Sequence, residues 1–267
     1  MALDTRTKRA SALGVARPWI RTKEPDITLG TSWRAASGNS YAGYTYFVPS
    51  VFLDPTTFTI AGIDGLTYIS TNPTTVTVTS MTMAADAYIY KSYGVNAIGD
   101  FTLTGTVNLT QAASIGTFNH IFGLMNTPGT MLTQATNNDG LACHTKGTLG
   151  NEFFGLYDFE TPQWIESASS DAMSVDYYVT WDRSGTTLSV DVKTGSHLGT
   201  LVQSESLTVP TTGYEYLCIT QSRDIVGSSL ISYTLRDMTF SYNPPPPPPS
   251  SNYYLGQYQH RFGVMES

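Results

Sequence analysis

Two carboxylates, Asp158 and Glu160, stand at a spacing that glycoside hydrolysis could use. Residues i and i+2 of a strand point to one face, so the two carboxylates would share a side of the chain. Retaining hydrolysis needs two carboxyl groups about 5–5.5 Å apart. Glu152, Trp164 and Glu166 lie nearby, but no third acid completes a catalytic pattern. A solvated strand edge or loop is the better interpretation, and we expect no enzyme activity.

No other set of reactive side chains has a catalytic or ligand-binding spacing. The sequence holds no G-x-S-x-G turn for a nucleophilic serine and no G-x-x-x-x-G-K-[ST] loop for phosphate. Cys143 and Cys218 match no metal or redox motif, and we expect buried free thiols rather than a disulfide. We therefore expect no cofactor and no metal ion. The histidines are isolated, none at the i, i+4 spacing of a helical metal site, and stand at His120, His144, His197 and His260.

A carbohydrate site is the binding function that the residues leave open. Sugar binding needs an exposed aromatic ring beside a few hydrogen-bonding groups. Trp164 is the best candidate because it follows a turn-like Thr-Pro-Gln segment and has Gln163 and Glu166 beside it. The alternative for Trp164 is packing in a core or an interface. Trp181 alternates with apolar residues of one strand, which predicts that it lies in the core.

The elements that must position these residues are β-strands. From residue 56 to 243 short runs alternate between apolar and polar residues, and the run FTLTGTVNLT at 101–110 places every second residue on one apolar face. A period of two is typical of a strand with one buried face. The link at 183–186 predicts a hairpin. The number and spacing of the runs predict an all-β fold, a two-sheet antiparallel β-sandwich of the jelly-roll type, over residues 56–243.

Both ends of the chain differ from this body. Residues 1–34 carry seven basic and three acidic groups, a net charge of 7 − 3 = +4 on a chain whose total is −7. We expect residues 1–55 to be an extended arm that binds other subunits, with copies of this chain forming a homo-oligomer. Nucleic acid is not favoured, because the charges are scattered and no aromatic stacking platform accompanies them. The arm residues expected to take part in assembly are Arg6, Lys8, Arg9, Arg17, Trp19 and Trp33.

The C-terminal end begins with six consecutive prolines, which cannot donate to a β-ladder. We expect residues 244–250 to be a polyproline linker, with a polyproline II rod about 19 Å long at roughly 3.1 Å per residue. Residues 251–267 would be an aromatic tail that docks on a partner, and a disordered linker with a free end is the alternative. The tail residues expected to dock are Tyr253, Tyr254, Tyr258 and Phe262.

The N-terminus shows no secretory signal, since no apolar core follows its positive charges. No segment is long and apolar enough to span a membrane. We therefore expect the protein to be made in a host cytoplasm and to have no membrane partner.

The body resembles the concanavalin A-like lectin/glucanase superfamily, and within it the laminin-G-like modules. Three stretches carry the likeness: DFTLTGTVNL at 100–109, YYVTWDRSGTTLSVDV at 177–192, and residues 216–240 with LCITQSRD and LRDMTF. The resemblance implies the jelly-roll sandwich and supports the fold more than any function. The glucanase pattern E-x-D-x-x-E is absent. Calcium often sits on the rim of such modules, and Asp139 or Asp224 would be the residues to hold it.

The opening residues 1–18 (MALDTRTKRASALGVARP) resemble the start of small structural proteins encoded among the head and tail genes of tailed bacteriophages. Asp4-Thr5-Arg6, Lys8-Arg9 and Ser11-Ala12 carry this likeness. It implies a virion structural protein that contacts major capsid or tail proteins, and we expect a capsid decoration or head-surface protein. The alternative is a receptor-binding adhesin that holds host surface glycans through the sandwich.

Overall fold

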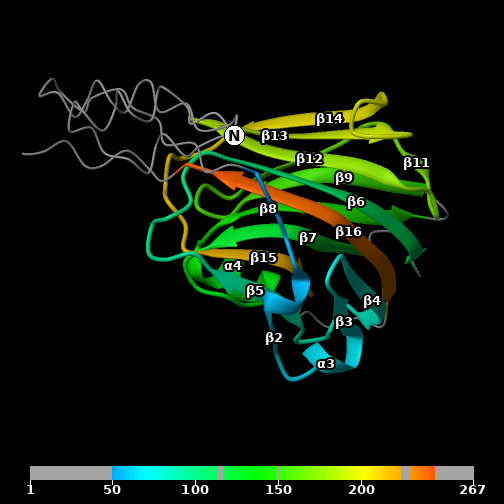
Figure 1. Ribbon diagram of the computed structural model, residues 1–267, viewed down its shortest axis with the longest axis horizontal. Helices are drawn as coiled ribbons and strands as arrows, with labels where there is room; N and C mark the ends of the chain where they lie inside the picture. The colour runs from blue at the N-terminus through cyan, green and yellow to red at the C-terminus, as the bar shows by residue number, and fades with distance from the viewer. Residues whose placement is uncertain (1–49, 113–116, 149–150, 224–228, 244–267) are drawn as a thin grey trace, which may run out of the picture.

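The protein folds into two antiparallel sheets packed face to face (Figure 1). The computed structural model describes residues 50–112, 117–148, 151–223 and 229–243. Sheet A has the order β14-β13-β12-β6-β16-β4-β3, with β1 beside β16, and sheet B has the order β10-β9-β8-β7-β15-β5-β2, with β11 beside β9. The expected all-β, jelly-roll sandwich is confirmed.

The strands of sheet A are β1 (Val51–Phe52), β3 (Ile69–Asn72), β4 (Thr75–Thr82), β6 (Phe101–Ala112), β12 (Tyr177–Ser184), β13 (Thr187–Thr194), β14 (Thr200–Thr208) and β16 (Leu230–Tyr242). The strands of sheet B are β2 (Thr59–Ala61), β5 (Tyr88–Ser92), β7 (Thr117–Met125), β8 (Leu141–Thr148), β9 (Asn151–Asp158), β10 (Gln163–Glu166), β11 (Asp171–Ala172) and β15 (Tyr216–Gln221).

The helices are short connections: the 3-10 helix η2 (Pro55–Thr57), α3 (Gly65–Tyr68) and α4 (Met131–Asn137). The hydroxyl of Thr130 accepts a hydrogen bond from the backbone N–H of Thr133 and so caps α4, which ends at Asn138 in the left-handed region with φ 48°. In the part of the chain that the structure describes, no helix has the length and apolar character needed to cross a membrane.

The core lies between the sheets and follows the alternation of the strands. In β6 the side chains of Phe101, Leu103 and Leu109 are buried, while Thr102 and Thr104 between them are partly exposed. Trp181 is fully buried, as expected, and its ring meets that of Phe101 at 4.6 Å between centroids. Gly105 leaves room for the core, because a Cβ there would lie 3.0 Å from Met238.

The expected hairpin joins β12 to β13, with Ser184 opposite Thr187 and Gly185 in the left-handed region at φ 60°. Both cysteines are buried and unpaired, so the expectation of free thiols is confirmed. Burial raises the pKa of the Cys143 and Cys218 thiols, which keeps them protonated.

The expected boundaries of the two terminal segments can be checked only where the structure describes the chain. Val51 and Phe52, which the sequence assigned to the arm, form β1 and pair with Phe240 and Thr239 of β16. Residues 1–49 and 244–267 lie outside the described residues. The expected assembly residues of the arm and docking residues of the tail fall in those ranges and stay predictions.

Candidate functional site

The outer face of sheet B presents a group of aromatic and charged side chains from three neighbouring strands. Along β8, β9 and β10 alternate residues point into the core, as Cys143, Leu156 and Ile165 do, and the residues between them point outward. We name the outward group the Trp164 face. It consists of His144 and Lys146 on β8, Phe153 and Tyr157 on β9, and Trp164 and Glu166 on β10.

The register of the strands brings β8 and β10 residues together across a glycine of β9. Glu166 and His144 are both direct cross-strand partners of Gly155. A Cβ at Gly155 would lie 2.5 Å from Cε1 of His144 and 2.4 Å from the carbonyl oxygen of Ile165. The imidazole of His144 therefore covers the position where any other residue would place its side chain, and only glycine permits this packing.

Trp164 forms the exposed part of this face. Its side chain is 60% exposed, the largest exposed fraction of any aromatic residue among those the structure describes. The directly opposite residue on β9 is Tyr157, whose ring stacks on that of Phe159 at 4.2 Å between centroids. The indole is thus the cross-strand neighbour of a packed aromatic pair and keeps most of its surface open to solvent.

An ion pair lies beside the indole. The Nζ atom of Lys146 is 2.6 Å from one carboxylate oxygen of Glu166 and 2.9 Å from the other. The side chains keep 26% and 16% of their surface exposed, so both can reach a ligand. Lys146 also lies over the ring of Phe153, at 5.9 Å from its centroid. The pair offers a donor and an acceptor at fixed positions near Trp164.

His144 forms the floor of the face and is neutral at physiological pH. Burial lowers the pKa of its imidazole to about 4, and the positive charge of Lys146 acts in the same direction. Because the ring carries no charge, it adds none to the ion pair above it.

Gln163 does not join the Trp164 face. Adjacent residues of a strand point to opposite sides, so Gln163 turns away from Trp164 and Glu166. Its Nε2 atom lies within hydrogen-bond distance of the Asp158 carboxylate at 3.2 Å, the Thr161 hydroxyl at 2.9 Å and the Thr208 carbonyl at 2.6 Å. The structure therefore brings together Trp164 and Glu166 of the expected sugar-binding residues, and it gives Gln163 contacts that join β10 to β14.

Asp158 and Glu160 serve the structure. Asp158 is fully buried and accepts hydrogen bonds from the backbone N–H groups of Glu160 at 2.9 Å and Thr161 at 3.3 Å. Glu160 accepts from the hydroxyls of Thr212 and Tyr214, both at 2.7 Å. Asp158 is thus buried rather than solvated, and the two carboxylates hold the turn after β9 and tie it to the segment before β15.

Glu152 is a second buried acid of β9. Its carboxyl group accepts a hydrogen bond from the Thr145 hydroxyl at 2.8 Å, and its side chain is fully buried between the sheets. Burial, with a smaller contribution from the nearby Asp171, raises the pKa of Glu152 to about 8. The carboxyl group is therefore mostly protonated at neutral pH and points away from the Trp164 face.

The rim acids expected as calcium ligands give little support for a cation. Asp139 accepts hydrogen bonds from the backbone N–H groups of Asn126 and Thr127, both at 2.8 Å, and so holds the loop before α4. Asp224 lies outside the described residues. Within the described ranges, the histidines, cysteines and acids form no group of three that could hold a metal ion.

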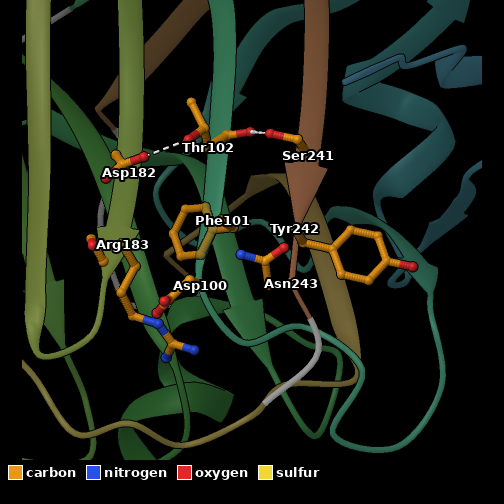
Figure 2. Close-up of a pocket in the computed structure, with 9 residues that line it drawn as sticks. Asp100, Phe101, Thr102, Asp182, Arg183, Ser241, Tyr242 and Asn243 are labelled. Carbon is orange, nitrogen blue, oxygen red and sulfur yellow. Dashed lines mark hydrogen bonds between the residues drawn. The ribbon is translucent and has the colours of Figure 1, made fainter. Parts of the chain in front are cut away.

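A polar pocket of about 190 Å³ lies at the end of the sandwich, between β6, β12 and β16 (Figure 2). Its groups bind one another and the adjacent backbone. Asp182 accepts from the Thr102 hydroxyl, Asp100 accepts from the Gly185 N–H at 2.8 Å, and Arg183 donates to the Thr212 carbonyl at 2.8 Å. Figure 2 shows the Tyr242 ring turned away from these groups. The pocket therefore lacks the open aromatic ring that the Trp164 face provides.

Sequence reasoning missed four members of the Trp164 face: His144, Lys146, Phe153 and Tyr157. The alternation in LACHTKGT at 141–148 places His144 and Lys146 together on the side opposite the apolar residues, so that signal was present. Their position near Trp164 depends on the pairing of β8 with β9 and of β9 with β10, which the local pattern does not contain.

No family model and no curated protein matches this sequence. Solved structures do match the fold. A functionally unknown protein from Saccharomyces cerevisiae has a TM-score of 0.50 and 9% identity, over 71% of this chain and 98% of that chain. The exoplasmic/lumenal domain of VIP36 in its Ca²⁺/Man-bound form has a TM-score of 0.51 and 10% identity, over 73% of this chain and 91% of that chain.

A third structure, the CBM2 module of the evolved Dit of Lactobacillus casei BL23 phage J-1, has a TM-score of 0.47 and 14% identity, over 75% of this chain and 97% of that chain. At such low identities the likeness concerns the fold alone. The two matches with TM-scores of 0.50 and 0.51, together with the two antiparallel sheets, show that this chain has a jelly-roll β-sandwich of the concanavalin A-like type.

Proposed function

We propose that this protein is a non-enzymatic glycan-binding protein and that the Trp164 face holds the sugar. The observation that carries the proposal is Trp164, 60% exposed on a regular strand and fixed beside the Lys146–Glu166 ion pair. Tryptophan is enriched at surfaces that bind a partner, because its ring combines a large apolar area with a polar N–H group.

The chemistry of the face suits a sugar ring. The C–H face of a pyranose packs on the indole, and its hydroxyls exchange hydrogen bonds with the Glu166 carboxylate and the Lys146 ammonium group. Both charged groups are already oriented by each other, so little side-chain entropy is lost when the ligand binds. The site is an open face rather than a deep pocket, which suits one or two residues of a longer glycan.

The solved structures support the proposal at the level of the fold. The VIP36 domain was determined with Ca²⁺ and Man bound. In this chain the described residues offer no three-ligand metal group, so the binding that we propose depends on the aromatic ring and the ion pair.

The test is a glycan array probed with the full chain, followed by affinity measurements on the glycans that bind. We expect Trp164→Ala to weaken binding at least tenfold and Trp164→Phe to retain part of it. The matched control is Leu198→Ala, since Leu198 is 96% exposed on the loop between β13 and β14. Absence of binding to every glycan, or equal affinity in Trp164→Ala and the control, contradicts the proposal.

The proposed setting is a receptor-binding adhesin of a virion. Glycan binding through the sandwich favours this reading over capsid decoration, whose evidence lies in terminal residues outside the described ranges. Mass spectrometry of purified particles would test the setting, and an adhesin should also be reached by antibodies on intact particles. A protein missing from the particles would contradict a virion role and leave the glycan-binding proposal standing.

A further inference from the structure

An aromatic groove lies where β1 joins the sandwich, between β1 and β16 of sheet A and the end of β5 of sheet B, on the side of β16 opposite to the pocket of Figure 2. It encloses about 360 Å³. Val51 and Phe52 of β1 form its outer wall and are 53% and 48% exposed. The residues that line it are Val51, Phe52, Leu53, Asp54, Thr57, Lys91, Tyr93, Phe240 and Tyr242.

The floor of this aromatic groove is a packed cluster of three rings. Tyr93, Phe240 and Tyr242 contact one another with all three centroid distances at 5.4 Å. The ammonium group of Lys91 lies 6.0 Å from the centroid of the Tyr93 ring. Rings that already hold one another present a rigid surface, which loses little entropy when a second apolar surface packs on it.

Grooves lined by aromatic side chains are the surfaces that recognise polyproline II segments. A polyproline helix is stiff before it binds, so its docking costs less entropy than the docking of a flexible peptide. This chain carries such a segment itself, six prolines at residues 244–249. They begin two residues after Tyr242, which lines the groove.

Asn243, the last described residue before the prolines, lies on the far side of β16 from the groove. The N–H of Asn243 donates to the carbonyl of Asp100, and its carbonyl accepts from the N–H of Gly99, both at 2.7 Å. These bonds hold Asn243 on the β6 side of β16, whereas the groove is on the β1 side. From the sequence we expect the six prolines to form a stiff rod about 19 Å long, at roughly 3.1 Å per residue, and a stiff rod does not turn back sharply to reach the groove of its own chain.

We infer that the aromatic groove binds residues 244–249 of a second copy of this chain. Since each copy has both a groove and a proline segment, two copies exchange these segments and close a symmetric dimer. The contact buries the exposed sides of Phe52 and Tyr242 against proline rings. This inference is independent of the proposed glycan binding, because the groove and the Trp164 face share no residue.

Sedimentation velocity of the full chain over a range of concentrations tests the inference. A groove variant combines Phe52→Ala with Tyr93→Ala, and a segment variant replaces all six prolines by serine. We expect the unaltered chain to dimerise and each variant alone to dimerise at least tenfold more weakly. Leu66→Ala is the control, because Leu66 is 84% exposed on α3, away from the groove. Thermal unfolding of each variant shows whether it is folded.

A mixture of the two variants provides the decisive measurement. The groove variant still has intact prolines and the segment variant still has an intact groove, so a mixed dimer regains one of the two contacts. We expect the mixture to dimerise more strongly than either variant alone. A chain that is monomeric at every concentration overturns the inference, as does a mixture no stronger than its components. A segment variant that dimerises normally while the groove variant does not would assign the groove to another segment, and this too overturns it.

Discussion

The outer face of sheet B consists of two halves, one open to solvent and one covered by another segment of the chain. A single row of cross-strand neighbours runs through both halves. The row runs from Glu166 through Gly155, His144 and His120 to Gln221. The first half belongs to the Trp164 face and is open at Trp164. The second half lies under the segment 126–140, which contains α4, and its polar side chains are fully buried.

The covering segment turns its half into an interior. Gln221 donates to the carbonyl of Gly129 at 2.6 Å, and the N–H of Met131 donates to the carbonyl of Ser222 at 3.0 Å. The ring of Phe159 closes over His120 at 5.5 Å between centroids. Similar residue types therefore serve packing in one half and stand exposed for binding in the other. Exposure, and not residue type, distinguishes the site from the interior.

Among changes on the outer face of sheet B, the largest effect should come from disturbing the covering segment. Gly140 ends the covering segment at φ 109°, and a Cβ there would lie 2.2 Å from the carbonyl oxygen of Leu124. We expect Gly140→Ala to lower the free energy of unfolding, measured in urea, by about 3 kcal/mol or more. Gly185→Ala is the matched control, with φ 60° and nothing within 4 Å of the new Cβ, and should cost about 1 kcal/mol. Equal losses would mean that the covering segment is not packed on β7.

Acid should destabilise the protein through a buried histidine in each half. Burial lowers the pKa of His120 to about 3 and that of His144 to about 4, from an ordinary value of 6.5. The unfolded chain then binds more protons, so stability is complete above pH 6.5 and falls as the pH drops toward these values, by about 1.4 kcal/mol per pKa unit for each group. NMR titration measures both imidazoles. An imidazole that titrates near 6.5 in the folded protein would contradict the prediction for its half.

Glu152, which is buried beneath the open half, should make the protein less stable as the pH rises, whereas the histidines make it less stable as the pH falls. The pKa of Glu152 is raised to about 8 from 4.5, so the folded state holds a proton that the unfolded chain releases. Its contribution to stability is complete below pH 4.5 and is lost as the pH rises to about 8. We expect Glu152→Gln to flatten the stability curve over this window, by a few kcal/mol at most. The free energy of unfolding in urea, measured at pH 5 and at pH 8 for the variant and the unaltered chain, tests this. The same difference between the two pH values in both proteins would contradict it.

The smallest effect on stability should come from the site. Trp164→Ala removes an exposed ring and should change the free energy of unfolding by no more than about 0.5 kcal/mol. Trp181→Ala, at a fully buried tryptophan, should cost about 3–5 kcal/mol. Chemical denaturation of both variants makes the comparison. A large loss in Trp164→Ala would mean that the indole is needed for packing, and would weaken its assignment to a sugar.

Some of the site could have been predicted more fully. The alternation that correctly placed Trp181 in the core also separates Gln163 from Trp164 and Glu166, because neighbouring residues of a strand face opposite ways. The grouping of Gln163, Trp164 and Glu166 by their closeness in sequence overlooked this alternation. In the same way His144 and Lys146 share a face of one strand. The histidines looked isolated in sequence, yet β7 and β8 make His120 and His144 direct partners.

The amino-acid sequence by itself determined the elements: strands with one apolar face, the hairpin at Gly185, the buried cysteines and the end of the last strand before six prolines. These follow from period-two alternation and from backbone preferences, which act over a few residues. Only the tertiary structure decided that β9 lies between Lys146 and Trp164, that segment 126–140 covers His120, and that Asn243 leaves on the β6 side. Strand order and the covering of a face depend on contacts between distant segments, and a local pattern does not encode them.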